Sequence, residues 1–305
     1  MSLLRLVLGA ALTLALIPFN ALAAPLEIVV SFSILGDLVR QVGGERVHVT
    51  TLVGPGEDAH NFEPRPSDAR KLRSAQLAVA SGLGFDPWLE RLAQTAGYKG
   101  RVLVASTGIE PIAAPDEQAD APVHGERHDT VDPHAWQDAT RAQRYVANIA
   151  DALAQIDPAG AATYRDNSKR YIAELKTLDD EIRGTLARIP PERRKVVSSH
   201  DAFGYFAHAY GIRFLAPAGI SNQSEPSASG VAKLIRQLRQ EKVPAVFVEN
   251  ISDPRLISRI QKESGAQMGG TLYSDALSGP DGPAKTYLEM MRYNLRTLVG
   301  ALAAN

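Results

Sequence analysis

Short apolar runs alternate with amphipathic stretches in the first third of this chain. Four apolar runs have the length of strands: Glu27–Ser31, Val47–Val53, Leu77–Ser81 and Val102–Ala105. Three stretches between them carry apolar residues at helical spacing: Ile34–Val42, Ser67–Ser74 and Pro87–Thr95. This β-α-β order predicts a parallel sheet with helices packed against it.

Two helices are predicted next, over Arg141–Ile156 and over a much longer segment, 158–189. Asp157-Pro158 opens the longer pattern and Pro190-Pro191 stops it. Its apolar residues form one stripe at helical spacing: Tyr164, Tyr171, Leu175, Leu178, Ile182 and Leu186. A helix of roughly 31 residues would be roughly 46 Å long. Because one domain does not need such a rod, we expect it to join two lobes.

The β-α order then resumes. The predicted strands are Lys195–Ser199, Ile212–Leu215, Pro244–Glu249 and Gly269–Tyr273. The predicted helices are Ala202–Tyr210, Ser229–Arg239, Pro254–Glu263 and Ala284–Leu302. The fold class is therefore α/β, with two lobes that each hold a mainly parallel sheet flanked by helices. The predicted boundaries are 24–157 for the N-terminal lobe, 158–189 for the linking helix and 190–305 for the C-terminal lobe.

Residues 1–23 are predicted to form a signal peptide. Leu6–Ile17 is an uncharged apolar stretch behind Arg5, and Ala21-Leu22-Ala23 fits the A-x-A cleavage rule. A membrane span needs about 20 apolar residues, and this stretch is shorter. The alternative interpretation is an uncleaved membrane anchor. We expect cleavage after Ala23, which leaves a soluble protein in the periplasm.

Composition narrows the classes of function. The 305 residues include 33 Lys and Arg against 34 Asp and Glu, a net charge of −1. Such a balance gives no electrostatic argument for binding nucleic acid or an anionic membrane. The sequence has no cysteine, which excludes disulfides, thiolate metal sites and a lipid-modified N-terminal cysteine. It also lacks the G-x-S-x-G, Walker and H-E-x-x-H motifs of common enzyme classes.

Four residues are candidate metal ligands. His60 follows the second predicted strand, His134 precedes a helix, His200 ends a strand, and Asp275 follows the last strand. In open α/β sheets, loops at one edge of the sheet form the ligand site. Three imidazoles and one carboxylate suit zinc, whereas manganese prefers more oxygen. Taken singly, a histidine in such a position is more often an ordinary loop residue than a metal ligand, and Asp275 could be a helix cap. Spacing alone therefore does not decide whether the four residues form a metal site.

Three acidic residues lie within two positions of a candidate histidine: Asp58, Asp132 and Asp201. One or more of them could accept the second ring N–H of the neighbouring imidazole. We also expect a helix dipole to disfavour the imidazolium form of His200, since a helix is predicted to begin beside it.

The remaining histidines are weaker candidates. His48 alternates with apolar residues and should face the surface, and His208 should pack within a helix or face solvent. His124 and His128 lie in an acidic loop, Asp116–Asp129, which either collects metal weakly or is simply solvated.

Five motifs together resemble the zinc/manganese-type periplasmic solute-binding proteins of ABC transporters (cluster A-I, or cluster 9), and most of all the zinc-binding members. They are His60-Asn61-Phe62-Glu63-Pro64, Asp132-Pro133-His134-Ala135-Trp136, Ser199-His200-Asp201-Ala202-Phe203, Glu225-Pro226-Ser227 and Tyr273-Ser274-Asp275-Ala276-Leu277. The resemblance covers essentially the whole mature chain. It implies two lobes bridged by one rigid helix, with the metal held between them by His60, His134, His200 and Asp275.

The residue at the third ligand position indicates which metal ion the site prefers. Manganese members of the resembled family tend to carry a carboxylate there, so His200 favours Zn²⁺, although the same shell also occurs in members that look like mixed zinc/manganese binders. Two features depart from the zinc members. The loop before His134 holds only two histidines, and no disulfide can form in the C-terminal lobe.

The function that the resemblance implies is a high-affinity zinc receptor that delivers Zn²⁺ to an inner-membrane ABC permease with a cytoplasmic ATPase. It leaves open whether a periplasmic zinc chaperone loads the protein, and we expect a monomer that does not bind nucleic acid and is not an enzyme. A mixed zinc/manganese receptor is the first alternative. The others are an exported zinc hydrolase with Glu63 or Glu225 as general base, and an adhesin in which the metal is structural.

Overall fold

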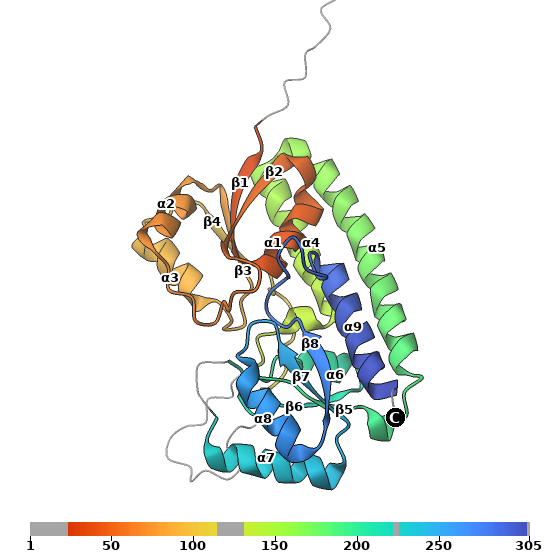
Figure 1. Cartoon of the computed structure of the whole chain (residues 1–305). Helices are drawn as coiled ribbons and strands as arrows, with labels where there is room; N and C mark the ends of the chain where they lie inside the picture. The colour runs from red at the N-terminus through yellow and green to blue at the C-terminus, as the bar shows by residue number, and fades with distance from the viewer. Residues whose placement is uncertain (1–23, 115–130, 222–225, 304–305) are drawn as a thin grey trace, which may run out of the picture.

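The computed structural model describes residues 24–114, 131–221 and 226–303, which form two α/β lobes and a long helix beside them (Figure 1). The N-terminal lobe contains, in chain order, β1 (Leu26–Phe32), α1 (Ser33–Gly43), β2 (Val47–Val53), α2 (Pro66–Ser74), β3 (Leu77–Ala80), α3 (Pro87–Thr95), β4 (Arg101–Val104) and α4 (Ala139–Ile156). Its four strands are ordered β2-β1-β3-β4, and every neighbouring pair is parallel.

The C-terminal lobe repeats this arrangement. It contains β5 (Lys195–Val197), α6 (Gly204–Tyr210), β6 (Arg213–Leu215), α7 (Ala228–Glu241), β7 (Ala245–Glu249), α8 (Pro254–Ser264), β8 (Gln267–Leu272) and α9 (Tyr287–Ala303). Its four strands are ordered β6-β5-β7-β8, again parallel throughout. The predicted α/β class with two parallel sheets is confirmed.

The long helix α5 covers Ala161–Leu186 and follows a 3-10 turn at Pro158–Gly160. Its 26 residues span about 39 Å at about 1.5 Å each, so the helix is shorter than the predicted segment 158–189. The predicted apolar stripe is buried along its whole length: Tyr164, Tyr171, Leu175, Leu178, Ile182 and Leu186. One end of α5 packs against α1 and α4, and the other against α6 and α9 (Figure 1).

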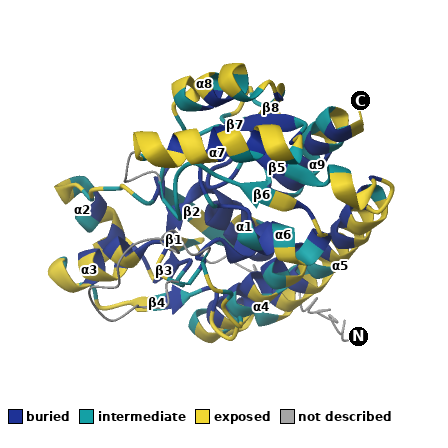
Figure 2. Ribbon diagram, turned by 90° about the horizontal axis from the view of Figure 1, so that it is seen from below, coloured by how far each residue is buried: buried dark blue, intermediate teal, exposed yellow. Residues whose placement is uncertain are grey.

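The two lobes share one hydrophobic core. A single cluster of buried side chains runs from Ile28 in β1 through Leu175 in α5 to Phe206 in α6 and Leu298 in α9. A second, smaller cluster lies under α7 and α8, whose outer faces are exposed (Figure 2). Because apolar burial is the main stabilising term, this continuous packing holds the two sheets in a fixed relation to each other.

Two predicted elements near His200 are shorter than expected. The strand predicted over Lys195–Ser199 ends at Val197, and the helix predicted over Ala202–Tyr210 begins at Gly204. The backbone leaves the sheet because the N–H groups of Ser199 and His200 donate to Glu249 Oε1, at 2.8 and 3.0 Å. The segment that carries His200 is thus a loop shaped by a side chain.

Some predictions lie outside the described residues: the signal peptide 1–23, the acidic loop with His124 and His128, and Glu225. Within the described part of the chain, no helix combines the length and apolar character needed to cross a bilayer.

The stripe on α5 gives a direct test of the shared core. Leu175 is fully buried, whereas the adjacent Lys176 is exposed. We expect Leu175→Ala to lower the free energy of unfolding by about 2–5 kcal/mol, because it leaves a cavity where the lobes meet. Urea titration of the metal-free protein measures this change. Lys176→Ala is the matched control, and an equal effect of both substitutions would contradict the shared core.

Candidate metal centre

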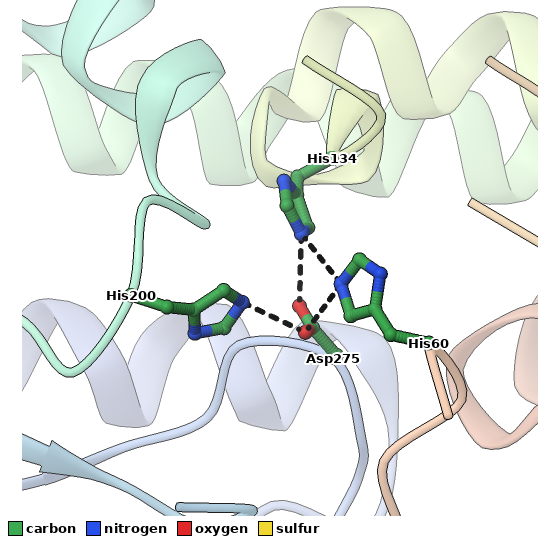
Figure 3. Close-up of side chains that lie close together, drawn as sticks. All are labelled: His60, His134, His200 and Asp275. Atoms are coloured by element: carbon green, nitrogen blue, oxygen red, sulfur yellow. Dashed lines mark hydrogen bonds and ion pairs between the residues drawn. The ribbon is translucent and has the colours of Figure 1, made fainter. Parts of the chain in front are cut away.

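His60, His134, His200 and Asp275 point toward one another between the two lobes (Figure 3). One ligand atom of each lies within 4.8 Å of the others. His60 Nε2 is 3.2 Å from His134 Nε2 and 3.4 Å from Asp275 Oδ2. Asp275 Oδ2 is 3.1 Å from His200 Nε2, and Asp275 Oδ1 is 3.7 Å from His134 Nε2. The structure therefore brings together all four residues singled out in the sequence.

Loops at strand ends carry these side chains. His60, His200 and Asp275 follow the carboxyl ends of β2, β5 and β8. His134 directly precedes a 3-10 turn, Ala135–Gln137, that leads into α4. Carboxyl ends of parallel strands are where α/β sheets form their ligand sites, and here the ends of the two sheets face each other.

The centre is shielded from water. The side chains of His134, His200 and Asp275 are 0% exposed and that of His60 is 6% exposed. His200 Nε2 and both carboxylate oxygens of Asp275 have no aligned hydrogen-bond partner. Buried polar atoms without partners are costly, so this arrangement of nitrogen and oxygen donors fits a bound cation.

Electrostatics among these side chains favour charge separation. Burial raises the pKa of Asp275, but the imidazoles of His134 and His200 outweigh it and hold that pKa well below 3.8. Burial lowers the pKa of His200, yet the carboxylates of Glu249 and Asp275 raise it well above 6.5. The expectation that a helix dipole disfavours the imidazolium form is wrong, since α6 begins four residues later and two carboxylates dominate.

Of the acidic neighbours considered from the sequence, Asp132 contacts an imidazole. Its Oδ1 accepts the backbone N–H of His134 at 2.9 Å and lies 2.8 Å from His134 Nδ1. Asp58 instead accepts the backbone N–H of His60 at 2.8 Å, which shapes the loop. The backbone N–H of Asp201 donates to the carbonyl of Gly219.

Sequence reasoning missed Glu249. This residue ends β7, is 1% exposed, and places Oε2 2.7 Å from His200 Nδ1. The contact is close but is not aligned as a hydrogen bond. A signal was present, because an acidic residue that ends an apolar strand is unusual unless a partner satisfies it.

The loop of Asp275 is tied to the N-terminal lobe although it follows the last strand of the other lobe. Trp136 Nε1 and Gln137 Nε2 both donate to the Ser274 carbonyl, at 3.0 and 2.7 Å. The Leu277 N–H donates to Ser33 Oγ at 3.0 Å. In the other direction, Asn250 Nδ2 donates to the Ala276 carbonyl at 3.2 Å. Trp136 thus supports the site, and its ring centroid lies 5.3 Å from that of His134.

Three residues considered earlier lie away from the centre. His48 is exposed, as predicted, with Nδ1 2.7 Å from Glu27 Oε2. His208 is exposed on α6, and Glu63 is exposed in the loop after His60.

An open pocket of about 520 Å³ borders His60, so this candidate ligand is the one nearest to solvent. Phe62 lines the same pocket.

Comparison with known proteins identifies the family. Residues 28–301 match the family model described as "Zinc-uptake complex component A periplasmic" (ZnuA). The chain belongs to this family. ZnuA-family proteins are substrate-binding components of metal ABC transporters and not enzymes, so an exported hydrolase is no longer an alternative.

Relatives within the family differ in the metal they are named for. The chain is 34% identical over 278 residues to the "Manganese-binding lipoprotein MntA" of Halalkalibacterium halodurans, covering 91% of this chain and 89% of that one. It is 33% identical to the "Iron-binding protein YfeA" of Yersinia pestis, covering 90% and 86%. The periplasmic zinc-binding protein TroA of Treponema pallidum superposes with a TM-score of 0.82 at 27% identity, covering 92% and 99%.

One buried hydrogen bond beside the centre can be removed cleanly. The hydroxyl of Tyr287, which is fully buried at the start of α9, donates to the Trp136 carbonyl at 2.6 Å. We expect Tyr287→Phe to lower the free energy of unfolding by about 1–3 kcal/mol, because it leaves a buried carbonyl unsatisfied. Denaturant titration measures this change. Tyr293→Phe, on the half-buried side of the same helix, is the control and should change stability less.

Proposed function

We propose that this protein is a periplasmic receptor that captures Zn²⁺ between its lobes and hands it to an ABC permease driven by a cytoplasmic ATPase. His60, His134, His200 and Asp275 are the proposed ligands. No bond is made or broken, since the ion is cargo. The proposal depends chiefly on one observation, the size and chemistry of the four-residue cage.

The spacing of the cage approaches that of a tetrahedral shell. Metal–ligand bonds of about 2.0–2.1 Å imply edges of about 3.3–3.4 Å between neighbouring ligand atoms. Four of the six distances between these side chains are 3.1, 3.2, 3.4 and 3.7 Å, taken to either oxygen of Asp275, and the four ligand atoms all lie within 4.8 Å of one another. Four protein ligands in such a shell favour tight binding over catalysis, because catalytic zinc keeps one coordination position open.

The nitrogen-rich donor set supports zinc as the preferred ion. Imidazole suits zinc, and sites of this kind generally bind Zn²⁺ more tightly than Mn²⁺. A mixed zinc/manganese receptor is the second candidate. It is favoured by relatives named for manganese and by Asp275, whose two oxygens both face the imidazoles and could supply additional oxygen coordination.

We also propose that export depends on cleavage after Ala23. Several relatives are named lipoproteins, but this sequence has no cysteine to carry a lipid. We further propose that the mature protein is a free periplasmic monomer with lobes 24–157 and 190–305.

A competitive titration of the metal-free protein tests the metal. We expect one tight Zn²⁺ site per chain, from which excess Mn²⁺ displaces little of the bound zinc. His200→Ala should weaken zinc binding by more than about 100-fold, because loss of a direct ligand should exceed the about 10- to 100-fold effect of losing an outer partner.

His208→Ala is the matched control, since His208 is exposed on α6 and is not one of the four clustered residues. Equal affinity for the two ions would favour the mixed-metal receptor. Absence of tight binding for both ions would overturn the proposed site.

Removal of the metal distinguishes between two hypotheses, a receptor that carries the ion as cargo and a protein that needs the ion to fold. Because the shared core consists of apolar side chains and includes none of the four candidate ligands, we expect the metal-free protein to melt in one cooperative transition. Zinc should raise the melting temperature by the linkage between binding and folding. Differential scanning calorimetry with and without a chelator measures both effects. Loss of the cooperative transition on chelation would instead indicate a structural metal.

A further inference from the structure

We propose that Glu249 is the positioning residue that makes His200 a metal ligand. Its carboxylate holds the loop of His200 through the backbone and keeps the Nδ1 proton of the ring on the side away from the metal. This inference rests on the proposed function, in which His200 binds the ion. It concerns a residue that touches neither the metal nor the other three candidate ligands.

The carboxylate of Glu249 contacts His200 in two ways. Oε1 accepts the backbone N–H groups of Ser199 and His200, at 2.8 and 3.0 Å. Oε2 lies 2.7 Å from the ring nitrogen Nδ1 of His200. The backbone N–H of Glu249 in turn donates to Ser199 Oγ at 3.2 Å. Both partners are buried, so water does not screen these contacts.

The same arrangement occurs on the other side of the cage. Asp132 Oδ1 accepts the backbone N–H of His134 and lies 2.8 Å from its Nδ1. Two imidazoles of the cage therefore each have a buried carboxylate behind them that also binds their own backbone. Asp132 is two residues from its histidine, whereas Glu249 reaches His200 across 49 residues, from the end of a neighbouring strand.

An ionised carboxylate only accepts hydrogen bonds. Its contact with Nδ1 is 2.7 Å long and is not aligned as a hydrogen bond, but at this distance the carboxylate favours a proton on that nitrogen, since two lone pairs would repel each other. The proton at Nδ1 leaves the lone pair of the neutral ring on Nε2, which lies 3.1 Å from Asp275 Oδ2 inside the cage. Carboxylate partners of this kind fix the tautomer of metal-binding histidines and increase their basicity.

The candidate ligands His134, His200 and Asp275 are supported in different ways. The loop of Asp275 is tied to the N-terminal lobe through Ser274 and Leu277, and His134 lies in that lobe. His200 is the candidate held by contacts within the C-terminal lobe, because β5 and β7 are neighbouring strands of its sheet. Glu249 thus links the ligand geometry to the sheet of the second lobe.

Glu249→Gln tests the proposal while preserving size. The Gln carbonyl can still accept the two backbone N–H groups, but its NH₂ group then faces Nδ1 and favours the proton on Nε2, where the metal should bind. We expect zinc affinity to fall about 10- to 100-fold. In a His200→Ala background the same substitution should cause no further loss, because Glu249 acts through that ring. Glu192→Gln, an exposed glutamate of the same lobe, is the matched control.

A spectroscopic measurement on the wild-type protein keeps the test valid if Glu249→Gln fails to fold. Long-range ¹H–¹⁵N correlations, assigned with His200→Ala, should show a slowly exchanging proton on Nδ1 in the metal-free protein, and Nε2 bound to zinc in the loaded protein. Zinc bound through Nδ1 would overturn the proposal. So would wild-type affinity in Glu249→Gln, or equal losses with and without His200.

Failure of the proposed function gives a different result. If the wild-type protein itself binds no zinc, the receptor proposal and the positioning role both fall, before any variant is compared. If wild-type binding is tight and only the Glu249→Gln comparisons fail, the receptor proposal stands and the role of Glu249 is overturned.

Discussion

The carboxylate of Asp275 is the constraint on which the rest of the site depends. An ionised group taken out of water costs several kcal/mol unless nearby charges and hydrogen bonds compensate for it. Here both oxygens are buried and face three imidazoles instead of backbone donors. Such a cluster is stable as a charge-separated pair or with a cation at its centre, so the loops around it must be held firmly in place.

Those loops are fixed by contacts that cross the boundary between the lobes. The Ser274 carbonyl accepts two hydrogen bonds from residues that follow His134, and Tyr287 bonds both to Asp37 and to the Trp136 carbonyl. The apolar core is likewise continuous from β1 through α5 to α9. The cage is therefore built at a rigid junction, and His60, which borders the open pocket, is its member nearest to solvent.

Much of this architecture was predictable from the sequence. The strand Val47–Val53 and the helix Pro87–Thr95 were predicted with the bounds the structure shows, because apolar periodicity is a local property of the chain. The candidate ligands were predictable for a related reason. Each lies in a loop next to a regular element, and loops at the carboxyl ends of parallel strands meet at one edge of a sheet.

The sequence by itself determined the residue types available for a metal site, the β-α order of both lobes and the long apolar stripe of α5. Only the tertiary structure decided the strand order β6-β5-β7-β8, which places Glu249 behind His200 across 49 residues. It also decided that Asp275 would be held by the N-terminal lobe. Local periodicity cannot encode either result, because both depend on which distant segments become neighbours when the shared core packs.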